Sequence, residues 1–138
     1  MPYVRIGGRA TYRPPILTKV QTDGSYTRQL QRIAAVVTKP DQSLQKEMMT
    51  IHATSSTETE WASVAMGIHL AQHHSDGVIG LENDLLGIIH ALMFAEKSIM
   101  QENERYYRNE IYRLAEASEW VGVRWIPREI NRADDLFR

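Results

Sequence analysis

The hydrophobic period of the chain changes at Ser55, and this change limits the folds that the sequence can adopt. Before it, residues 16–22 and 32–38 form apolar runs typical of strands, and residues 46–54 alternate apolar and polar side chains. From residue 61 to 71 the apolar side chains recur three or four positions apart, which predicts the buried face of a helix. The sequence therefore predicts three strands, with the third antiparallel to the second, followed by a helix.

The segment 55–58, which reads SSTE, has the pattern of a capping box, in which Ser55 accepts from the first helical turn and Glu58 follows three residues later. The helix that it starts should end near His74. The remaining predicted elements are a short buried strand at 78–81, a helix led by Asp84, a helix through 107–115 after the polar stretch 96–104, a strand at 120–126 and a short helix at 132–138. This order predicts an α/β fold with a five-stranded mixed sheet, in which three antiparallel strands precede parallel strands reached by right-handed crossovers, and helices pack on both faces.

The length of 138 residues suits one domain with a substantial hydrophobic core. We expect residues 16–138 to form this domain. Residues 1–15 precede it as a basic lead-in with three arginines (Arg5, Arg9 and Arg13) and no acidic residue. A solvated, flexible arm is the simpler interpretation of this lead-in, and an arm that contacts phosphates is the alternative.

Composition excludes several classes of protein. The chain has no cysteine, so it has neither a disulfide framework nor a thiolate metal site nor a cysteine nucleophile. The net charge of −1 does not suit a strongly basic nucleic-acid binder. We find no signal peptide and no apolar run long enough to span a membrane, and we expect a cytoplasmic protein.

Five acidic residues stand at the ends of predicted elements. Asp23 ends the first strand, Glu60 lies in the first turn of the first helix, and Asp84 follows the fourth strand. Asp134 and Asp135 open the last helix. If these ends meet at one edge of the sheet, the carboxylates repel one another and raise one another's pKa values. A hard divalent cation such as Mg²⁺ removes that repulsion, because it prefers oxygen ligands.

Each of these acids also has an ordinary structural interpretation. Asp23 with Gly24 could open a hairpin, Asp84 could cap the second helix, and Glu60 could be a capping glutamate. Glu58 already fits the capping role from Ser55, which leaves Glu60 free for another one. We favour metal ligation for the set, because the acids occur together in this order.

The segments TDGS, STETEWASVAMGI, GLENDLLGII and VRWIPREINRADDL carry a resemblance to the type 1 ribonuclease H family, with its ribonuclease H-like fold, over residues 17–137. The resemblance implies endonucleolytic cleavage of the RNA strand of an RNA/DNA hybrid, with two Mg²⁺ ions, or Mn²⁺, and no protein partner. The implied catalytic residues and metal ligands are Asp23, Glu60, Asp84 and Asp134, with Asp135 as the alternative to Asp134.

The same resemblance implies a set of substrate contacts, and the chain departs from the family at several of them. A Tyr-Thr-Arg-Gln sequence replaces the glycine-rich turn after Ser25, the mobile histidine loop is missing, and the region 95–104 is not basic. Hybrid binding should then depend on the arm and on the arginines of the third helix. The implied substrate-binding residues are Gly24, Ser25, Ser55, Ser56, Thr57, Arg128 and Asn131, and the helix arginines are Arg105, Arg108 and Arg113.

Two other functions remain open. The departures would suit a non-catalytic module of the same fold that binds nucleic acid or a partner, and the same chemistry could act on branched DNA. The chain has lost none of the four acids, so we favour the enzyme. His69 and His73 have a spacing that can bind zinc, but no third ligand is evident, and we expect a solvated helix face.

Overall fold

The computed structural model describes residues 2–6, 14–75, 77–94 and 101–138. Its centre is a six-stranded sheet with the strand order β1-β6-β5-β2-β3-β4. The strands are β1 (Val4–Arg5), β2 (Thr18–Tyr26), β3 (Gln31–Thr38), β4 (Leu44–Thr50), β5 (Val78–Asn83) and β6 (Trp120–Trp125). The helices are α1 (Ser56–His73), α2 (Leu86–Phe94) and α3 (Glu102–Glu116), followed by the 3-10 helices η1 (Arg128–Ile130) and η2 (Asp134–Phe137).

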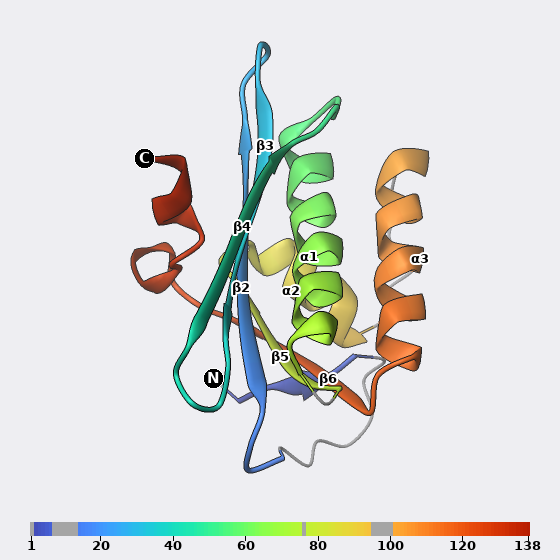
Figure 1. Cartoon of the computed structure of the whole chain (residues 1–138). Helices are drawn as coiled ribbons and strands as arrows, with labels where there is room; N and C mark the ends of the chain where they lie inside the picture. Colours follow the sequence, from blue (N-terminus) through green and yellow to red (C-terminus); the bar gives the residue numbers. More distant parts are fainter. Residues whose placement is uncertain (1, 7–13, 76, 95–100) are drawn as a thin grey trace.

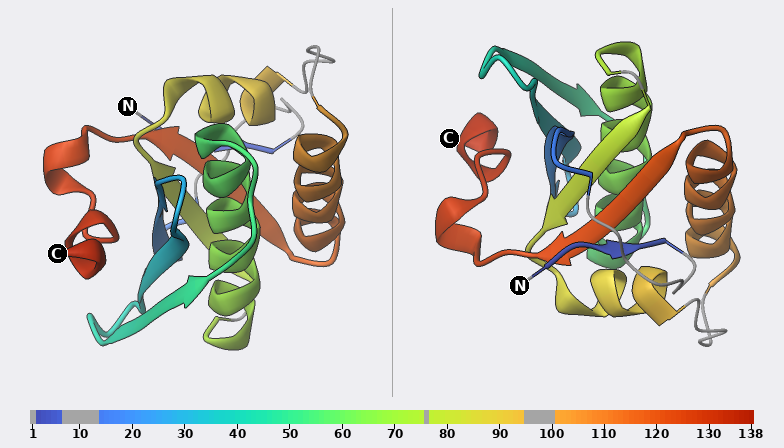
Figure 2. Two further views of the ribbon diagram at one scale, coloured as in Figure 1. Left: turned by 90° about the horizontal axis from the view of Figure 1, so that it is seen from above. Right: turned by 90° about the horizontal axis from the view of Figure 1, so that it is seen from below.

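The sheet is mixed, as the sequence predicted. Strands β2, β3 and β4 form an antiparallel meander, and β5 and β6 add to β2 in parallel. Helices α1 and α3 lie on one side of the sheet, and η1 and η2 lie on the other (Figures 1 and 2). The predicted α/β class is therefore confirmed.

The number of strands differs from the prediction, because the lead-in supplies a sixth strand. Val4 and Arg5 pair antiparallel with Val123 and Gly122 of β6. This strand has only two residues and depends on tertiary pairing, so local periodicity could not reveal it. Arg9 and Arg13 of the expected arm lie outside the described residues.

Tyr3 anchors this first strand to the sheet. Its side chain is 1% exposed and its ring meets Trp120 edge to face, with 6.3 Å between the ring centroids. The ring covers Gly80 so closely that a Cβ atom there would lie 2.7 Å from it. The guanidinium of Arg124 stacks on the ring, 4.2 Å from its centroid. The described start of the chain is thus packed on the sheet rather than solvated.

Strand β2 continues through the Asp-Gly pair. Asp23 pairs with Ala34 and Gly24 with Ile33, and the chain reverses only after Tyr26, where Thr27 N donates to Leu30 O. The hairpin interpretation of Asp23 is therefore wrong.

Helix α1 packs closely on β2, and this contact brings the start of the helix to the end of the strand. Gly67 permits the approach, because a Cβ atom there would lie only 2.2 Å from Thr22 Cγ2. The apolar face of α1 and the inner positions of β2 and β3 then pack with apolar residues of β5, β6, α2 and α3 in the main core. In the described part of the chain, no helix is both long and apolar enough to cross a membrane.

The last predicted helix is a 3-10 helix and is shorter than expected. Leu136 N donates to Ala133 O and Arg138 N to Asp135 O, which are 3-10 spacings. Ala133 is fully buried against Ala34 and Val36 on the face of the sheet opposite α1. Four residues are too few for a stable α-helix, and packing on the sheet fixes the tighter turn instead.

Candidate active site

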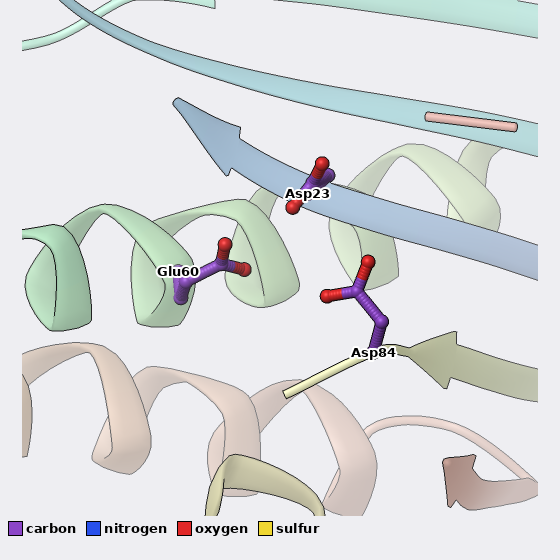
Figure 3. A group of neighbouring side chains, drawn as sticks. All are labelled: Asp23, Glu60 and Asp84. Carbon is purple, nitrogen blue, oxygen red and sulfur yellow. The ribbon is translucent and has the colours of Figure 1, made fainter. Parts of the chain in front are cut away.

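Three carboxylates from distant parts of the chain meet beyond the point where the parallel pairing of the central strands β2 and β5 ends. Asp23 lies on β2, Glu60 in the first turns of α1, and Asp84 directly after β5, and their side chains point toward a shared space (Figure 3). One carboxylate oxygen from each lies within 4.8 Å of the other two. This spacing suits the shared coordination of a cation.

Gly24 brings two of these carboxylates together. Its N–H donates to Asp23 Oδ1 at 3.0 Å and to Glu60 Oε1 at 3.2 Å. A side chain at this position would not fit, because a Cβ atom would lie 2.9 Å from Thr59 Cγ2. Among the described residues, the buried Glu60 Oε2 has no hydrogen-bond partner. A buried carboxylate oxygen without a donor is strongly unfavourable unless it binds a proton or a cation.

Capping of α1 uses Glu58 and leaves Glu60 free. Ser55 Oγ accepts from Glu58 N at 3.1 Å, and Glu58 Oε2 accepts from Thr54 N at 3.2 Å. The glutamate thus reaches back one residue further than in the predicted capping box, which closes on the cap residue itself.

Asp84 is likewise free of the capping role that its position suggests. The side chain of Asn83, not Asp84, accepts from Leu85 N, at 2.8 Å. The main-chain carbonyl of Asp84 accepts from Trp125 Nε1 at 2.9 Å, and its carboxylate accepts from Asn131 Nδ2 at 3.3 Å. The main chain is fixed and the carboxylate points into the cleft.

Burial and crowding raise the pKa values of these acids. Burial, with the nearby charge of Asp84, raises the pKa of Asp23 to about 6. Burial and the charge of Asp23 raise the pKa of Glu60 to about 9. Burial also raises the pKa of Asp84. Without a cation, the pair Asp23 and Glu60 therefore retains a proton at neutral pH.

Asp134 lies in the same cleft but has a different environment. The cleft has a volume of about 420 Å³ and is lined by all four predicted acids together with Arg128 and Arg138. Asp134 Oδ2 accepts from Arg138 at 2.8 Å and Oδ1 from Arg128 at 3.5 Å. Although burial alone would raise the pKa of Asp134, the two guanidinium groups outweigh it and lower this pKa.

Asp135 points elsewhere. Asp135 is exposed and lines a separate hollow together with Gln21, Glu82 and Arg132. The geometry thus favours Asp134 over Asp135 as the acid that accompanies the other three.

Most of the expected substrate-binding residues are accessible. Gly24, Ser25 and Arg128 line the cleft. Ser56 and Thr57 are exposed at the start of α1.

Asn131 is the exception. It is 2% exposed, and its amide donates to Thr22 O and Asp84 Oδ2 and accepts from Ala133 N. Its polar groups are engaged within the protein, so a substrate contact for this side chain does not fit the structure.

Three cleft residues were not singled out from the sequence. Arg138 stands four residues after Asp134, a spacing that could have indicated the ion pair. Arg32 and Phe137 also line the cleft, with the guanidinium 5.2 Å from the ring centroid, and no local pattern links them.

The two histidines of α1 lie outside the cleft. Their Nε2 atoms are 3.3 Å apart, and both side chains are exposed. In the described part of the chain, the group of three potential metal ligands is the one formed by Asp23, Glu60 and Asp84, and the histidine pair has no third member.

The residues of the cleft fit a hard divalent cation. The donors of the triad are carboxylate oxygens, one of which is buried without a partner among the described residues. Of the three arginines that line the cleft, Arg128 and Arg138 form ion pairs with Asp134 rather than with the triad. Mg²⁺ and Mn²⁺ bind such all-oxygen sites, whereas zinc prefers nitrogen and sulfur ligands.

The fold and this acidic cleft define a ribonuclease H-like protein. RNase H1 from the halophilic archaeon Halobacterium salinarum superposes with a TM-score of 0.78 at 19% identity, over 86% of this chain and 92% of that one. The N-terminal RNase H domain of a Mycobacterium tuberculosis protein gives 0.77 at 17% identity, over 88% and 90%. LC11-RNase H1, determined in complex with an RNA/DNA hybrid, gives 0.75 at 18% identity, over 86% and 92%.

Comparison of the sequence with protein families identifies the family of the chain. Residues 21–137 match the model of the reverse transcriptase-like family, and the chain belongs to that family. No curated protein matches the chain. The resemblance to type 1 ribonuclease H is thus confirmed at the level of the fold and family.

Proposed function

We propose that the protein is a divalent-metal-dependent endoribonuclease that hydrolyses the RNA strand of RNA/DNA hybrids. The observation that carries this proposal is the meeting of Asp23, Glu60 and Asp84, with oxygens within 4.8 Å of one another, inside a ribonuclease H-like fold. A non-catalytic module that binds nucleic acid would not benefit from this cluster of carboxylates, because the carboxylates repel one another and also repel a phosphate backbone.

The four acids Asp23, Glu60, Asp84 and Asp134 are the proposed ligands of two Mg²⁺ ions. When bound, such ions activate a water and stabilise the attacking and leaving oxygens of a phosphodiester displacement. The chain's own contribution is to hold the ligands rigidly. Gly24 N–H orients Asp23 and Glu60, and Asn131 orients Asp84.

Two arginines at the mouth of the cleft are suited to the phosphodiester. The side chains of Arg128 and Arg138 are both 71% exposed and direct their guanidinium groups into the same cleft as the acids. Guanidinium groups bind phosphate oxygens in a planar, bidentate geometry. Arg128 would thus meet the scissile region from the segment in which other family members carry a histidine loop.

The hybrid is the proposed substrate because the site can meet two different strands. Gly24 and Ser25 lie in the cleft, where an RNA strand would pass, and Ser56 and Thr57 present hydroxyl groups at the start of α1 for the DNA strand. A 2′-hydroxyl is what distinguishes RNA from DNA at such a site. LC11-RNase H1 was determined with an RNA/DNA hybrid, which supports this choice. The absence of cysteine is compatible with a reducing compartment, and we propose the cytoplasm.

The test is an end-labelled cleavage assay with RNA/DNA hybrid, duplex RNA, duplex DNA and branched DNA, each in Mg²⁺, in Mn²⁺ and in EDTA. We expect cuts in the RNA strand of the hybrid alone, and none in EDTA. Cleavage of branched DNA with the hybrid left intact would transfer the same chemistry to another substrate. No cleavage of any substrate, by protein that binds the hybrid, would favour the non-catalytic module. Asp23→Asn serves as the matched inactive control.

A further inference from the structure

A buried glutamate lies on the face of the sheet opposite α1, outside the acidic cleft. Glu82 of β5 is 1% exposed, and both of its carboxylate oxygens are engaged. Its Oε2 accepts from Tyr3 Oη at 2.9 Å and from Arg124 Nε at 2.7 Å, and it forms an ion pair with Arg124. Its Oε1 accepts from Gln21 Nε2 at 2.8 Å. The mechanism above uses none of these groups.

Gln21 carries this network to the C-terminal segment. It lies beside Glu82 in the parallel register of β2 and β5 and is 4% exposed. Its Oε1 accepts from Arg132 N at 3.0 Å, and its Nε2 also donates to Ile130 O at 3.4 Å. One side chain therefore binds the main chain on both sides of Asn131.

The orientation of this amide is fixed by Glu82. An ionised carboxylate can only accept hydrogen bonds, and the Arg132 N–H can only donate one. Gln21 must therefore turn its NH₂ group toward Glu82 and its carbonyl oxygen toward Arg132. If the amide were rotated by 180°, its NH₂ group would face the Arg132 N–H, and its carbonyl oxygen would face the carboxylate of Glu82.

Asn131 links this segment to two of the acids, Asp84 and Asp134. Its side-chain amide donates to Thr22 O at 2.9 Å and to Asp84 Oδ2 at 3.3 Å. Its main-chain carbonyl accepts from Asp134 N at 3.3 Å. The segment 130–132 leads from η1 to η2 on the side of the sheet away from α1 (Figure 2), so its placement sets where Asp134 stands relative to Asp84.

We propose that Gln21, with its amide oriented by Glu82, is a positioning residue that fixes segment 130–132 and thereby the separation of Asp84 and Asp134. The inference rests on the proposed function for its consequence in catalysis, but not for its geometry. An apolar residue at position 21 could fill the same space. It could not hold the main chain of Ile130 and Arg132, which is the part that the acids depend on.

The test compares Gln21→Met with Gln72→Met. Methionine has nearly the shape of glutamine and removes its hydrogen bonds. Gln72 is a matched control, because its amide also bridges distant parts of the chain, donating to Leu114 O at 2.8 Å and to Ser118 Oγ at 2.7 Å, far from the cleft. Both variants should lose stability, so stability alone does not distinguish a positioning role.

Three measurements do distinguish it. In the metal-free protein, hydrogen exchange at the Arg132 amide should accelerate at least about tenfold in Gln21→Met and not in Gln72→Met, because its acceptor is gone. The affinity for Mn²⁺, measured by calorimetry, should fall about 10- to 100-fold in Gln21→Met alone, the range found when a partner of a metal ligand is removed. The turnover number on hybrid should fall by a similar factor, with KM within about twofold of the parent.

A charge exchange provides the second variant. Gln21→Glu alone places two carboxylates in contact and should lower Mn²⁺ affinity as Gln21→Met does. Adding Glu82→Gln restores a donor facing an acceptor. Position 21 then still accepts from Arg132 N–H but no longer donates to Ile130 O, which is the longer contact at 3.4 Å, so the double variant should regain part of the lost protection and affinity.

The outcomes are separable. Unchanged Arg132 exchange and Mn²⁺ affinity in Gln21→Met, or no recovery in the double variant, would overturn the positioning role. A parent protein that binds Mn²⁺ but cleaves nothing would overturn the proposed function, while the exchange and affinity measurements would still decide the role of Gln21.

Discussion

Replacing Glu60 by glutamine should stabilise the metal-free protein and change how its stability depends on pH. The glutamine side chain could keep the contact with Gly24 N–H through its oxygen, at the 3.2 Å distance of the parent. Its NH₂ group would replace the oxygen that has no partner among the described residues and could donate to Asp23. The substitution thus removes the ionisable carboxyl group without removing a contact.

The sign follows from the direction of the pKa shift. The pKa of Glu60 is raised from 4.5 to about 9 by burial and by Asp23. The folded protein then binds a proton that the unfolded chain has already released, so the free energy of unfolding falls as pH rises from about 4.5 toward 9. One linked proton corresponds to at most about 1.4 kcal/mol per pH unit, or about 2.7 kcal/mol between pH 6 and pH 8.

The assay is urea unfolding in EDTA at half-unit steps from pH 5 to pH 8.5, followed by tryptophan fluorescence. The parent should lose stability steadily above pH 6, whereas Glu60→Gln should show little slope above that pH and exceed the parent at pH 8. Glu116→Gln, at the exposed end of α3, controls for the loss of one negative charge. A parent whose stability is flat or rises over this range, or a Glu60→Gln profile parallel to it, would refute the electrostatic reasoning.

Three further predictions concern the placement of single side chains. Asp134→Ala should reduce turnover on hybrid at saturating Mg²⁺ far more than Asp135→Ala, because Asp135 lies outside the cleft; the reverse ranking would mean that Asp135 is the ligand. Tyr3→Ala should cost about 3–5 kcal/mol in urea unfolding, as expected for a fully buried ring, and a loss below about 1 kcal/mol would show that the first strand is a solvated arm. Gly67→Ala should cost about 1–3 kcal/mol, because the added carbon would lie 2.2 Å from a side chain of β2, and a neutral result would mean that α1 can move away from the sheet without loss.

The sequence predicted the elements whose signals are local. The capping pattern at Ser55 and the change of period placed α1 correctly, and the alternation after Trp120 placed β6. It did not predict β1, because a two-residue strand has no period, and its stability comes from Tyr3 packing on residues about eighty or more positions away. Local sequence patterns report the secondary structure that a segment prefers, whereas β1 forms because of its tertiary contacts with β6.

In the candidate site, too, some features could be predicted from the sequence and others depend on tertiary packing. The sequence shows acids near the ends of several predicted elements, and the topology of a mixed sheet then predicts that they meet. The prediction that Asp23 ends its strand was wrong, because β2 continues to Tyr26. The resemblance favoured Asp134 over Asp135, and the structure supplies the physical reason, because it shows which residues of the last turn pack on the sheet. Here Ala133 and Leu136, three residues apart, pack on the sheet and turn Asp134 into the cleft.

The charges in the cleft are divided in a way that predicts cooperative binding of metal and hybrid. Asp23 and Glu60 form a buried acidic pair, whereas Arg128 and Arg138, two of the three arginines that line the cleft, both pair with Asp134. A divalent cation would supply positive charge to the buried pair, and by attracting Asp134 it would release the arginines for a phosphate.

Each ligand would therefore favour the other, by a coupling that is reciprocal and typically 5- to 150-fold. We expect a hybrid whose RNA strand carries 2′-O-methyl groups, which block cleavage, to bind at least about fivefold more tightly in Mg²⁺ than in EDTA at equal ionic strength. Fluorescence anisotropy measures this difference directly. The gain should shrink in Arg128→Ala, because one of the two released guanidinium groups is then missing. Equal affinities in Mg²⁺ and EDTA would show that the arginines stay bound to Asp134 when the metal arrives.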